Sequence, residues 1–331
     1  MRRIDIAIAL FAAASPLAAQ QHQHETGQPQ EPAQERMQHN SRLLASTEQL
    51  AARLDSGTVV VLHVGRSDSA YREGHVPGAR FLPLSAVAAT VNGQVNEFPA
   101  VERMAAAFRE LSVGDAGTIV LYGDDAGLLA ARAWVALDLM GHGDQAALLD
   151  GGLVRWRAER RPLETGPAPP AAAGGRFTPR WQGAKLASAE WVRSHLGDST
   201  VLFVDARPAD QYGGAEPPCP PNQPSCLQLP PERRGHIPGA VSIFWMNQLV
   251  SREDPALKPM HELHHTLWEP AGADQPRVRT IVTYCRSGVQ ASHAYFVARY
   301  IGYADVRLYD GSMSEWAGLP AAQHPVAAGG R

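Results

Sequence analysis

Thr280-Ile-Val-Thr-Tyr-Cys-Arg-Ser-Gly-Val289 is the stretch that decides the fold, because an apolar β run ends there at a cysteine and a glycine-containing turn. Thr118-Ile-Val-Leu-Tyr-Gly123 repeats the run in the first half of the chain, with glycine in place of cysteine. Two further pairs keep the same offset of about 160 positions: Gly74-His-Val-Pro-Gly-Ala79 with Gly235-His-Ile-Pro-Gly-Ala240, and Asp150-Gly-Gly-Leu-Val-Arg-Trp156 with Asp310-Gly-Ser-Met-Ser-Glu-Trp316. The chain therefore contains a duplicated domain.

Apolar runs of strand length alternate with segments of helical spacing in both halves. The predicted strands are residues 58–64, 118–122, 200–204, 280–284 and 306–308, and the predicted helices are residues 101–111, 128–140 and 291–301. This alternation predicts α/β domains in which helices cover both faces of a parallel sheet. A run rich in proline, glycine and alanine separates the halves, so we expect a first domain at 43–161, a linker at 162–180 and a second domain at 181–325.

Composition supports two globular domains and argues against several classes of partner. The 331 residues are 44% apolar and 19% charged, enough for two cores of roughly 100 to 150 residues each. The net charge of -3 and a pI near 6.5 give no electrostatic reason to expect nucleic acid or a membrane surface as a partner.

The first residues have the pattern of a secretory signal peptide. Arg2 and Arg3 precede a short apolar run that ends in small residues, and this run is too short to span a bilayer. We expect the signal peptide at 1–19, followed by a disordered polar segment at 20–42 that offers no core for an apolar helix. The mature protein is then periplasmic or secreted.

Two of the three cysteines lie in a proline-rich insertion of the second half. Cys219 and Cys226 are seven positions apart, and in an oxidising compartment they are predicted to form a disulfide that stiffens a surface loop. A redox-active pair and half of a metal site are the alternatives, but neither C-x-x-C spacing nor flanking ligands support them. Cys285 then remains as a free, reactive thiol.

Cys285 lies between a predicted strand and a predicted helix, where chemistry is expected. Unpaired backbone N–H groups and the positive end of a helix dipole meet there, and both stabilise a thiolate. The adjacent Arg286 adds a positive charge, as do Arg207 and Arg234 if their loops converge on the cysteine. We therefore expect the pKa of the thiol to lie below its usual range. The alternative is that Cys285 is a small apolar residue at a strand end.

The chain resembles the tandem-domain rhodaneses, a family of thiosulfate and 3-mercaptopyruvate sulfurtransferases, over nearly its whole mature length. The resemblance rests on the two Gly-His-Val/Ile-Pro-Gly-Ala segments, on Val204-Asp-Ala-Arg207, and on residues 284–289 and 310–316. It implies two rhodanese-like α/β domains, of which the second is catalytic and the first has lost its cysteine. Gly123 stands at the matching place in the first domain, followed by two aspartates that would repel an anion.

The resemblance also implies a double displacement through a persulfide on Cys285, in a crevice between its loop and the first domain. Cyanide or a thiol would accept the sulfur from a monomeric protein, and no metal or organic cofactor would be needed. Arg286 favours thiosulfate as the donor, whereas the rest of the loop resembles the 3-mercaptopyruvate branch. A persulfide carrier without efficient turnover is a third possibility. The residues implied in donor binding are Arg286, Ser287, Gly288, Val289, Gln290, Arg207 and Arg234.

Other motifs have structural interpretations. A cysteine phosphatase would need an arginine six residues after the cysteine, and Ala291 stands there. The two histidines that precede Pro-Gly, His75 and His236, are predicted to be hydrogen-bonded structural residues. A third motif, His261-Glu-Leu-His264-His265, has the spacing of a metal site on one helix face, but it is predicted to be a solvated face.

Overall fold

The computed structural model describes residues 40–123, 125–167, 176–216 and 228–329. The predicted signal peptide, most of the predicted polar segment, and Cys219 and Cys226 lie outside these ranges. Everything described belongs to one compact unit, Ala33–Arg331. Within the described ranges, no helix has both the length and the apolar character that crossing a bilayer requires.

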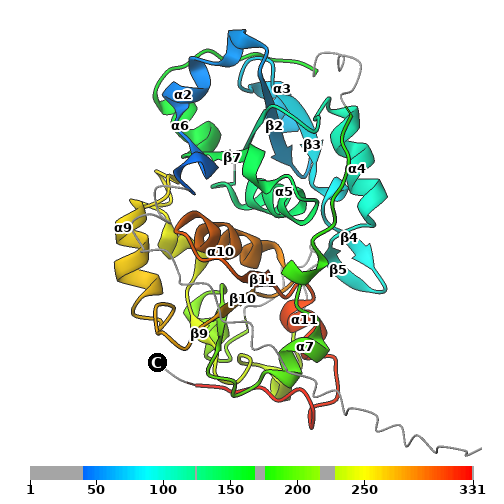
Figure 1. Cartoon of the computed structure of the whole chain (residues 1–331), viewed down its shortest axis with the longest axis vertical. Coiled ribbons are helices and arrows are strands. Elements are labelled where there is room, and N and C mark those ends of the chain that lie inside the picture. The colour runs from blue at the N-terminus through cyan, green and yellow to red at the C-terminus, as the bar shows by residue number, and fades with distance from the viewer. Residues whose placement is uncertain (1–39, 124, 168–175, 217–227, 330–331) are drawn as a thin grey trace, which may run out of the picture. The chain divides into compact units, whose positions relative to one another are not determined.

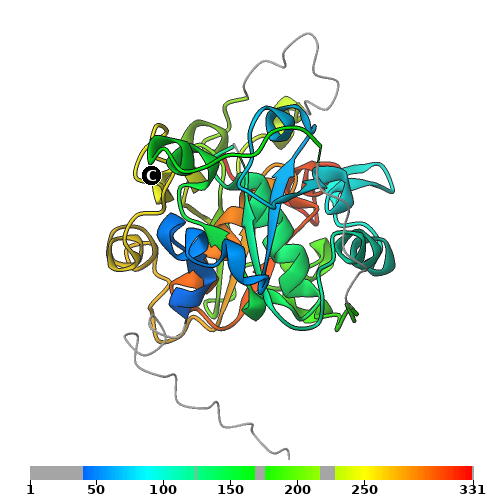
Figure 2. The same ribbon diagram turned by 90° about the horizontal axis from the view of Figure 1, so that it is seen from above.

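The first half forms a five-stranded parallel sheet in the order β1-β7-β6-β2-β3 (Figure 1). Its central strands are apolar and largely buried, as expected for a sheet covered on both faces. Figure 2 shows helices on either side of these strands. The strands are β1 (Leu44–Ala45), β2 (Val59–Gly65), β3 (Arg80–Pro83), β6 (Thr118–Tyr122) and β7 (Ala146–Leu149), and the helices are α2 (Thr47–Ala51), α3 (Ser69–Glu73), α4 (Val101–Glu110), α5 (Leu128–Leu139) and α6 (Gly152–Ala158).

The second half repeats the plan with a four-stranded parallel sheet in the order β11-β10-β8-β9. A two-stranded antiparallel hairpin, β4 (Ala89–Val91) with β5 (Gln94–Glu97), stands apart from both sheets. The strands of the second sheet are β8 (Val201–Asp205), β9 (Val241–Ser242), β10 (Thr280–Tyr284) and β11 (Val306–Leu308), and the helices are α7 (Ala189–Ser194), α8 (Ala209–Tyr212), α9 (Met260–Leu263), α10 (Val289–Tyr300) and α11 (Ser312–Trp316).

Short helical turns complete the described chain. Seven are 3-10 turns, and one, η8 (His264–Trp268), is π-helical and continues α9. The 3-10 turns are η1 (Ser41–Leu43), η2 (Leu54–Ser56), η3 (Leu84–Ala86), η4 (Gly143–Gln145), η5 (Gly183–Lys185), η6 (Pro231–Arg233) and η7 (Trp245–Gln248).

Strand register brings the carboxyl ends of three strands of the second sheet together. Tyr284 of β10 pairs with Asp205 of β8, and Thr283 pairs with Leu308 of β11. Residues that follow these strands therefore meet at one edge, which is where open parallel sheets bind their ligands. Cys285 begins the loop at the central one of these three strand ends.

The two halves pack through equivalent helices, α5 and α10, which lie side by side in Figure 1. The Trp134 and Phe296 rings meet edge to face, with centroids 5.0 Å apart. The buried Tyr295 hydroxyl donates to Asp138 Oδ2 at 2.7 Å. Apolar residues on nearly all faces of both helices are buried, so this contact is a core and not a surface patch.

The prediction of a solvated face in the histidine-rich segment is wrong. His261 and His265 are exposed, but His264 is only 6% exposed and its Nε2 lies 2.7 Å from Asp274 Oδ2. The physical reason is that the helix widens into the π turn η8, where His264 packs among Trp268 and Tyr303.

Candidate active site

Cys285 lies at the junction that the sequence predicts, directly after β10 and before α10. Its side chain is buried, with 1% of the residue exposed. The backbone N–H groups of Ser287, Gln290 and Ala291 donate to its sulfur. The loop and the first turn of α10 therefore form a cradle of donors around one sulfur atom.

Burial raises the pKa of the Cys285 thiol, and the nearby Asp205 carboxylate raises it further, although the three N–H groups act in the opposite direction. The expectation of a lowered pKa is therefore wrong. The physical reason is that removing the thiolate from water costs more than the loop donors and the helix dipole return. An anion on this sulfur is nevertheless hydrogen-bonded as soon as it forms.

Ser312 binds the backbone of the Cys285 loop, and it is not among the residues predicted from the sequence. Its Oγ accepts from the N–H groups of Cys285 and Gly288, both at 3.1 Å, and donates to the Tyr309 carbonyl at 2.9 Å. Ser312 is fully buried and has a φ of +52°. Its counterpart in the first half is Gly152, with a φ of +54°. A serine at a position where the repeat has glycine was therefore the sequence feature that could have identified this residue.

The three candidate arginines are each held by another group of the protein. Arg286 forms a bidentate pair with Glu216, with contacts of 2.6 and 2.7 Å. Arg207 is buried and bonds both carboxylate oxygens of Asp205 as well as the Gly235 carbonyl. Arg234 is half-buried, and its Nε donates to the Leu229 carbonyl at 3.1 Å.

The remaining loop residues shape the backbone. Gly288 has a φ of +82°, and a Cβ there would lie 2.3 Å from Asp310 Oδ1, so only glycine fits. Val289 is 7% exposed and begins α10. The backbone N–H of Gln290 faces the sulfur, and its side chain is half-buried.

The first half contributes directly to this site through Arg132 of α5. Its guanidinium is fully buried and donates to both carboxylate oxygens of Asp310, which lies two residues after the end of β11. It also donates to Ser292 Oγ at 3.3 Å and stacks over the Phe98 ring at 3.4 Å. The Phe98 N–H donates to Asp310 Oδ2 at 2.9 Å. Asp310 is thus bound by the first half while it lies against Gly288 of the loop.

The β4–β5 hairpin also reaches the loop. Asn96 Nδ2 donates to Ser287 Oγ at 2.9 Å, and the Asn96 carbonyl accepts from Arg132. The first half therefore borders the Cys285 loop, because it contacts Ser287 directly and holds Asp310, which lies against Gly288. Neither contact could be found from sequence, because the partners are far apart in the chain.

Glu97, the last residue of the hairpin, has the most perturbed carboxyl of this region. Burial, reinforced by repulsion from Asp310, raises its pKa to about 8. Its pKa in the folded protein is above the usual value of 4.5, so the folded protein keeps a proton that the unfolded chain releases. The stabilisation from this proton is complete below pH 4.5 and is lost as the pH rises through about 8.

Glu97→Gln is therefore expected to raise the urea midpoint of unfolding relative to the wild type, by an amount that grows between pH 4.5 and about 8. The measurement is urea unfolding of both proteins across that pH range. Glu110→Gln, on the exposed end of α4, serves as the matched control and is expected to leave the midpoint unchanged. A midpoint difference that does not vary with pH would contradict the assignment.

The equivalent loop of the first half holds a carboxylate instead of a thiol. Gly123 stands where Cys285 stands in the second half, and a Cβ there would lie 2.9 Å from Asp125 Oδ1. Asp125 Oδ2 accepts from the Leu129 N–H at 3.0 Å, at the start of α5. This half thus has no thiol at the equivalent position, and the Asp125 carboxylate binds an N–H group at the start of α5.

The prediction that His75 and His236 are structural is confirmed. His75 stacks on Tyr71 at 3.8 Å, and its Nδ1 lies 2.8 Å from the Tyr71 carbonyl. His236 repeats both contacts with Tyr212 at 3.7 and 2.9 Å.

The fold and the loop define an α/β protein with two related halves and a cysteine at the carboxyl edge of the second sheet. The chain belongs to the rhodanese family of sulfurtransferases, because the model of the rhodanese-like domain matches residues 46–159 and 188–319.

Relatives along most of the chain agree with this assignment. The "Sulfur carrier protein TtuD" of Thermus thermophilus is 32% identical over 292 residues, covering 87% of this chain and 97% of the relative. The "Probable 3-mercaptopyruvate sulfurtransferase" of Pseudomonas aeruginosa is 32% identical over 302 residues, covering 88% and 99%. The "Thiosulfate sulfurtransferase" of that organism is 29% identical over 280 residues, covering 84% and 95%.

A solved structure shows the same fold. The 3-mercaptopyruvate sulfotransferase SseA from Escherichia coli matches with a TM-score of 0.67 and 25% identity. The match covers 82% of this chain and 98% of SseA. The predicted fold of two tandem rhodanese-like α/β domains is thereby confirmed.

Proposed function

We propose that the protein transfers sulfane sulfur through a persulfide on Cys285. The observation that carries this proposal is the cradle of N–H groups from Ser287, Gln290 and Ala291 around the buried sulfur. The Cys285 thiolate attacks the outer sulfur of thiosulfate, the sulfur–sulfur bond of the donor breaks, and sulfite leaves with the electron pair. The outer sulfur of the persulfide then carries the negative charge, which the N–H groups stabilise.

The second displacement returns the enzyme to its starting state. Cyanide or a thiolate attacks the outer sulfur of the persulfide, and the bond between the two sulfur atoms breaks. Thiocyanate or a new persulfide leaves, and the electron pair stays on Cys285 as a thiolate. Neither displacement needs an external oxidant or reductant, because the transferred sulfur keeps its oxidation state.

Thiosulfate is the proposed donor because Arg286 directly follows the nucleophile and presents a fork of donors to an anion. Glu216 occupies that fork. Burial opposes its ionisation, but the hydrogen bonds from Arg286 and the Leu229 N–H, together with the charge of Arg234, hold the pKa of this carboxyl below its usual range. An anionic donor thus has to displace the Glu216 carboxylate from the Arg286 guanidinium. The bidentate contact with Glu216 also means that Arg286 can bind a carboxylate, and 3-mercaptopyruvate carries one. This contact, together with the similarity to a relative named for that substrate, supports 3-mercaptopyruvate as the second candidate donor.

Arg286→Met is expected to raise the KM for thiosulfate about tenfold, because a charge-assisted hydrogen bond to the donor contributes about 1.5 kcal/mol or more. The test is steady-state thiocyanate formation from cyanide with thiosulfate and, separately, with 3-mercaptopyruvate. Arg286→Lys is the matched control, since it keeps the charge without the fork and should recover part of the loss. Preference for 3-mercaptopyruvate in the wild type would overturn the donor assignment, and no turnover with either would favour a carrier.

A separate proposal concerns the export of the protein and rests on its first residues. We propose that residues 1–19 direct export and that Cys219 and Cys226 are bridged in the mature protein. Mass spectrometry of the protein from a periplasmic fraction, with and without reduction, tests both statements. A chain that keeps Met1 or two alkylatable loop thiols would contradict them.

A further inference from the structure

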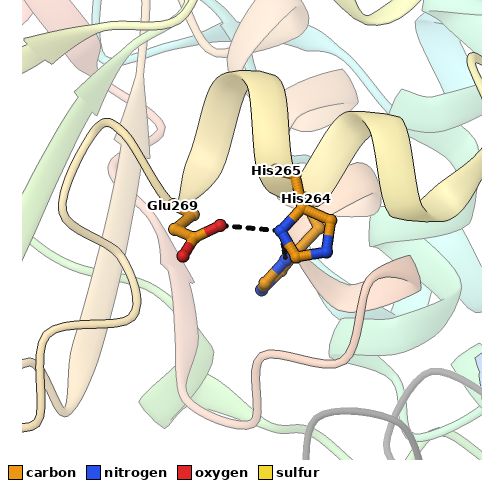
Figure 3. Close-up of side chains that lie close together, drawn as sticks. All are labelled: His264, His265 and Glu269. Carbon is orange, nitrogen blue, oxygen red and sulfur yellow. Dashed lines mark hydrogen bonds and ion pairs between the residues drawn. The ribbon is translucent and has the colours of Figure 1, made fainter.

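Three potential metal ligands converge on the helix formed by α9 and η8, away from the Cys285 loop. His264 and His265 each offer a ring nitrogen and Glu269 a carboxylate oxygen, and these three atoms all lie within 4.8 Å of one another (Figure 3). The two Nδ1 atoms are 3.4 Å apart, and His265 Nδ1 lies 2.7 Å from Glu269 Oε2. This set differs from the one that the sequence spacing singled out, because Glu269 takes the place of His261.

The backbone explains why these three side chains meet. His265 and Glu269 are four residues apart on one helix face, and a π turn spans His264–Trp268 between α9 and Glu269. Single π turns within helices are rare and occur frequently at functional sites. Trp268, buried on the inner side of this turn, donates from Nε1 to Gln248 Oε1 at 3.3 Å and anchors the segment to the core.

A second set of contacts orients His264. Its Nε2 lies 2.7 Å from Asp274 Oδ2, and the Tyr303 hydroxyl donates to the other oxygen of Asp274 at 2.7 Å. When Nε2–H donates to the carboxylate, the neutral imidazole keeps its lone pair on Nδ1, the atom that faces His265. A carboxylate behind a metal-binding histidine fixes its tautomer and raises its basicity in this way.

We propose that His264 Nδ1, His265 Nδ1 and the Glu269 carboxylate bind one divalent transition-metal ion of the zinc class. Metal–nitrogen distances near 2.05 Å in a tetrahedral site place two nitrogens about 3.3 Å apart, which agrees with the observed separation of 3.4 Å. The Glu269 carboxylate must shift to lie at the same spacing from both nitrogens, because its Oε2 is now 2.7 Å from His265 Nδ1, and this side chain is half-exposed and can move. Two imidazoles disfavour Mg²⁺ and Ca²⁺, which prefer oxygen ligands.

The site has three protein ligands and leaves one coordination position for water or an external ligand. His265 and Glu269 are exposed, so the ion is exchangeable and not locked in the core. Binding releases the proton that otherwise lies between His265 Nδ1 and its neighbours.

The test is a titration of the full chain with Zn²⁺ by calorimetry, and with Co²⁺ by visible absorption. The wild type is expected to bind one equivalent that is lost in His265→Gln and weakened at least tenfold in Glu269→Gln. That equivalent should show no thiolate-to-metal charge-transfer band, which separates it from sites built on the cysteines. Asp274→Asn is expected to weaken it about tenfold through His264.

His261→Gln is the matched control, because His261 is exposed on α9 one turn earlier and lies outside the cluster. It is expected to bind the metal as the wild type does. Absence of binding in the wild type, unchanged binding in His265→Gln, or a thiolate charge-transfer band for the affected equivalent would overturn the proposal. His265 and Glu269 are exposed, so these variants are expected to fold.

Discussion

Replacing Cys285 with serine is expected to lower thiocyanate formation by at least about 1,000-fold with either donor, because no other residue of the loop can carry the transferred sulfur. The hydroxyl takes the place of the sulfur, keeps the hydrogen bonds from the loop N–H groups and fits the buried space. The urea midpoint of unfolding should therefore change little while turnover disappears. Steady-state rates and urea unfolding of the two proteins provide the measurement.

The control for this prediction uses the other cysteines of the chain. A Cys219→Ser/Cys226→Ser variant is expected to retain turnover, because both cysteines belong to the proline-rich insertion of the sequence and not to the Thr280–Val289 stretch that contains Cys285. If Cys285→Ser keeps turnover within tenfold of the wild type, the nucleophile lies elsewhere and the proposed mechanism is wrong.

Replacing Arg132 with methionine is expected to destabilise the protein by about 3–5 kcal/mol, because it leaves the Asp310 carboxylate buried without its cation. The same change removes donors to Ser292 and to the Asn96 carbonyl, so the hairpin loosens over the Cys285 loop. A loop misplaced by about 1 Å loses up to about 100-fold in rate, and we expect a loss of this order in kcat. Urea unfolding and steady-state kinetics measure the two effects.

Two further variants test the cause of that loss. Adding Asp310→Asn to Arg132→Met removes the unpaired charge and should recover part of the stability. Arg193→Met breaks the exposed ion pair with Glu190 and is expected to leave the urea midpoint unchanged. If Arg132→Met and Arg193→Met lower the free energy of unfolding by the same amount, the buried contact between the two halves contributes no more to stability than an exposed ion pair.

Much of the fold could be predicted from sequence because its central strands are continuous apolar runs with clear ends. The strands at Thr118–Tyr122, Thr280–Tyr284 and Val306–Leu308 have the predicted bounds. Helix α10 begins two residues earlier than predicted, because Gly288 with its positive φ already ends the loop. Cys285 was singled out from its place between a predicted strand and a predicted helix and from the resemblance of its loop to that of the rhodaneses.

The rest of the site depends on contacts between distant residues, which no local pattern reports. Arg132 lies 178 positions from Asp310, and Asn96 lies 191 positions from Ser287. The direction of the Cys285 pKa shift was mispredicted because burial, which depends on the whole fold, outweighs the local donors. His264 was mispredicted because the π turn changes which side chains face the core.

The most direct test of the proposed mechanism is the mass of the Cys285 peptide after the protein is mixed with thiosulfate in the absence of an acceptor. We predict that this peptide gains the mass of one sulfur atom and that one equivalent of sulfite is released. Addition of cyanide should then remove the extra mass and yield one equivalent of thiocyanate. An unmodified Cys285 peptide from a protein that still produces thiocyanate would contradict the persulfide mechanism.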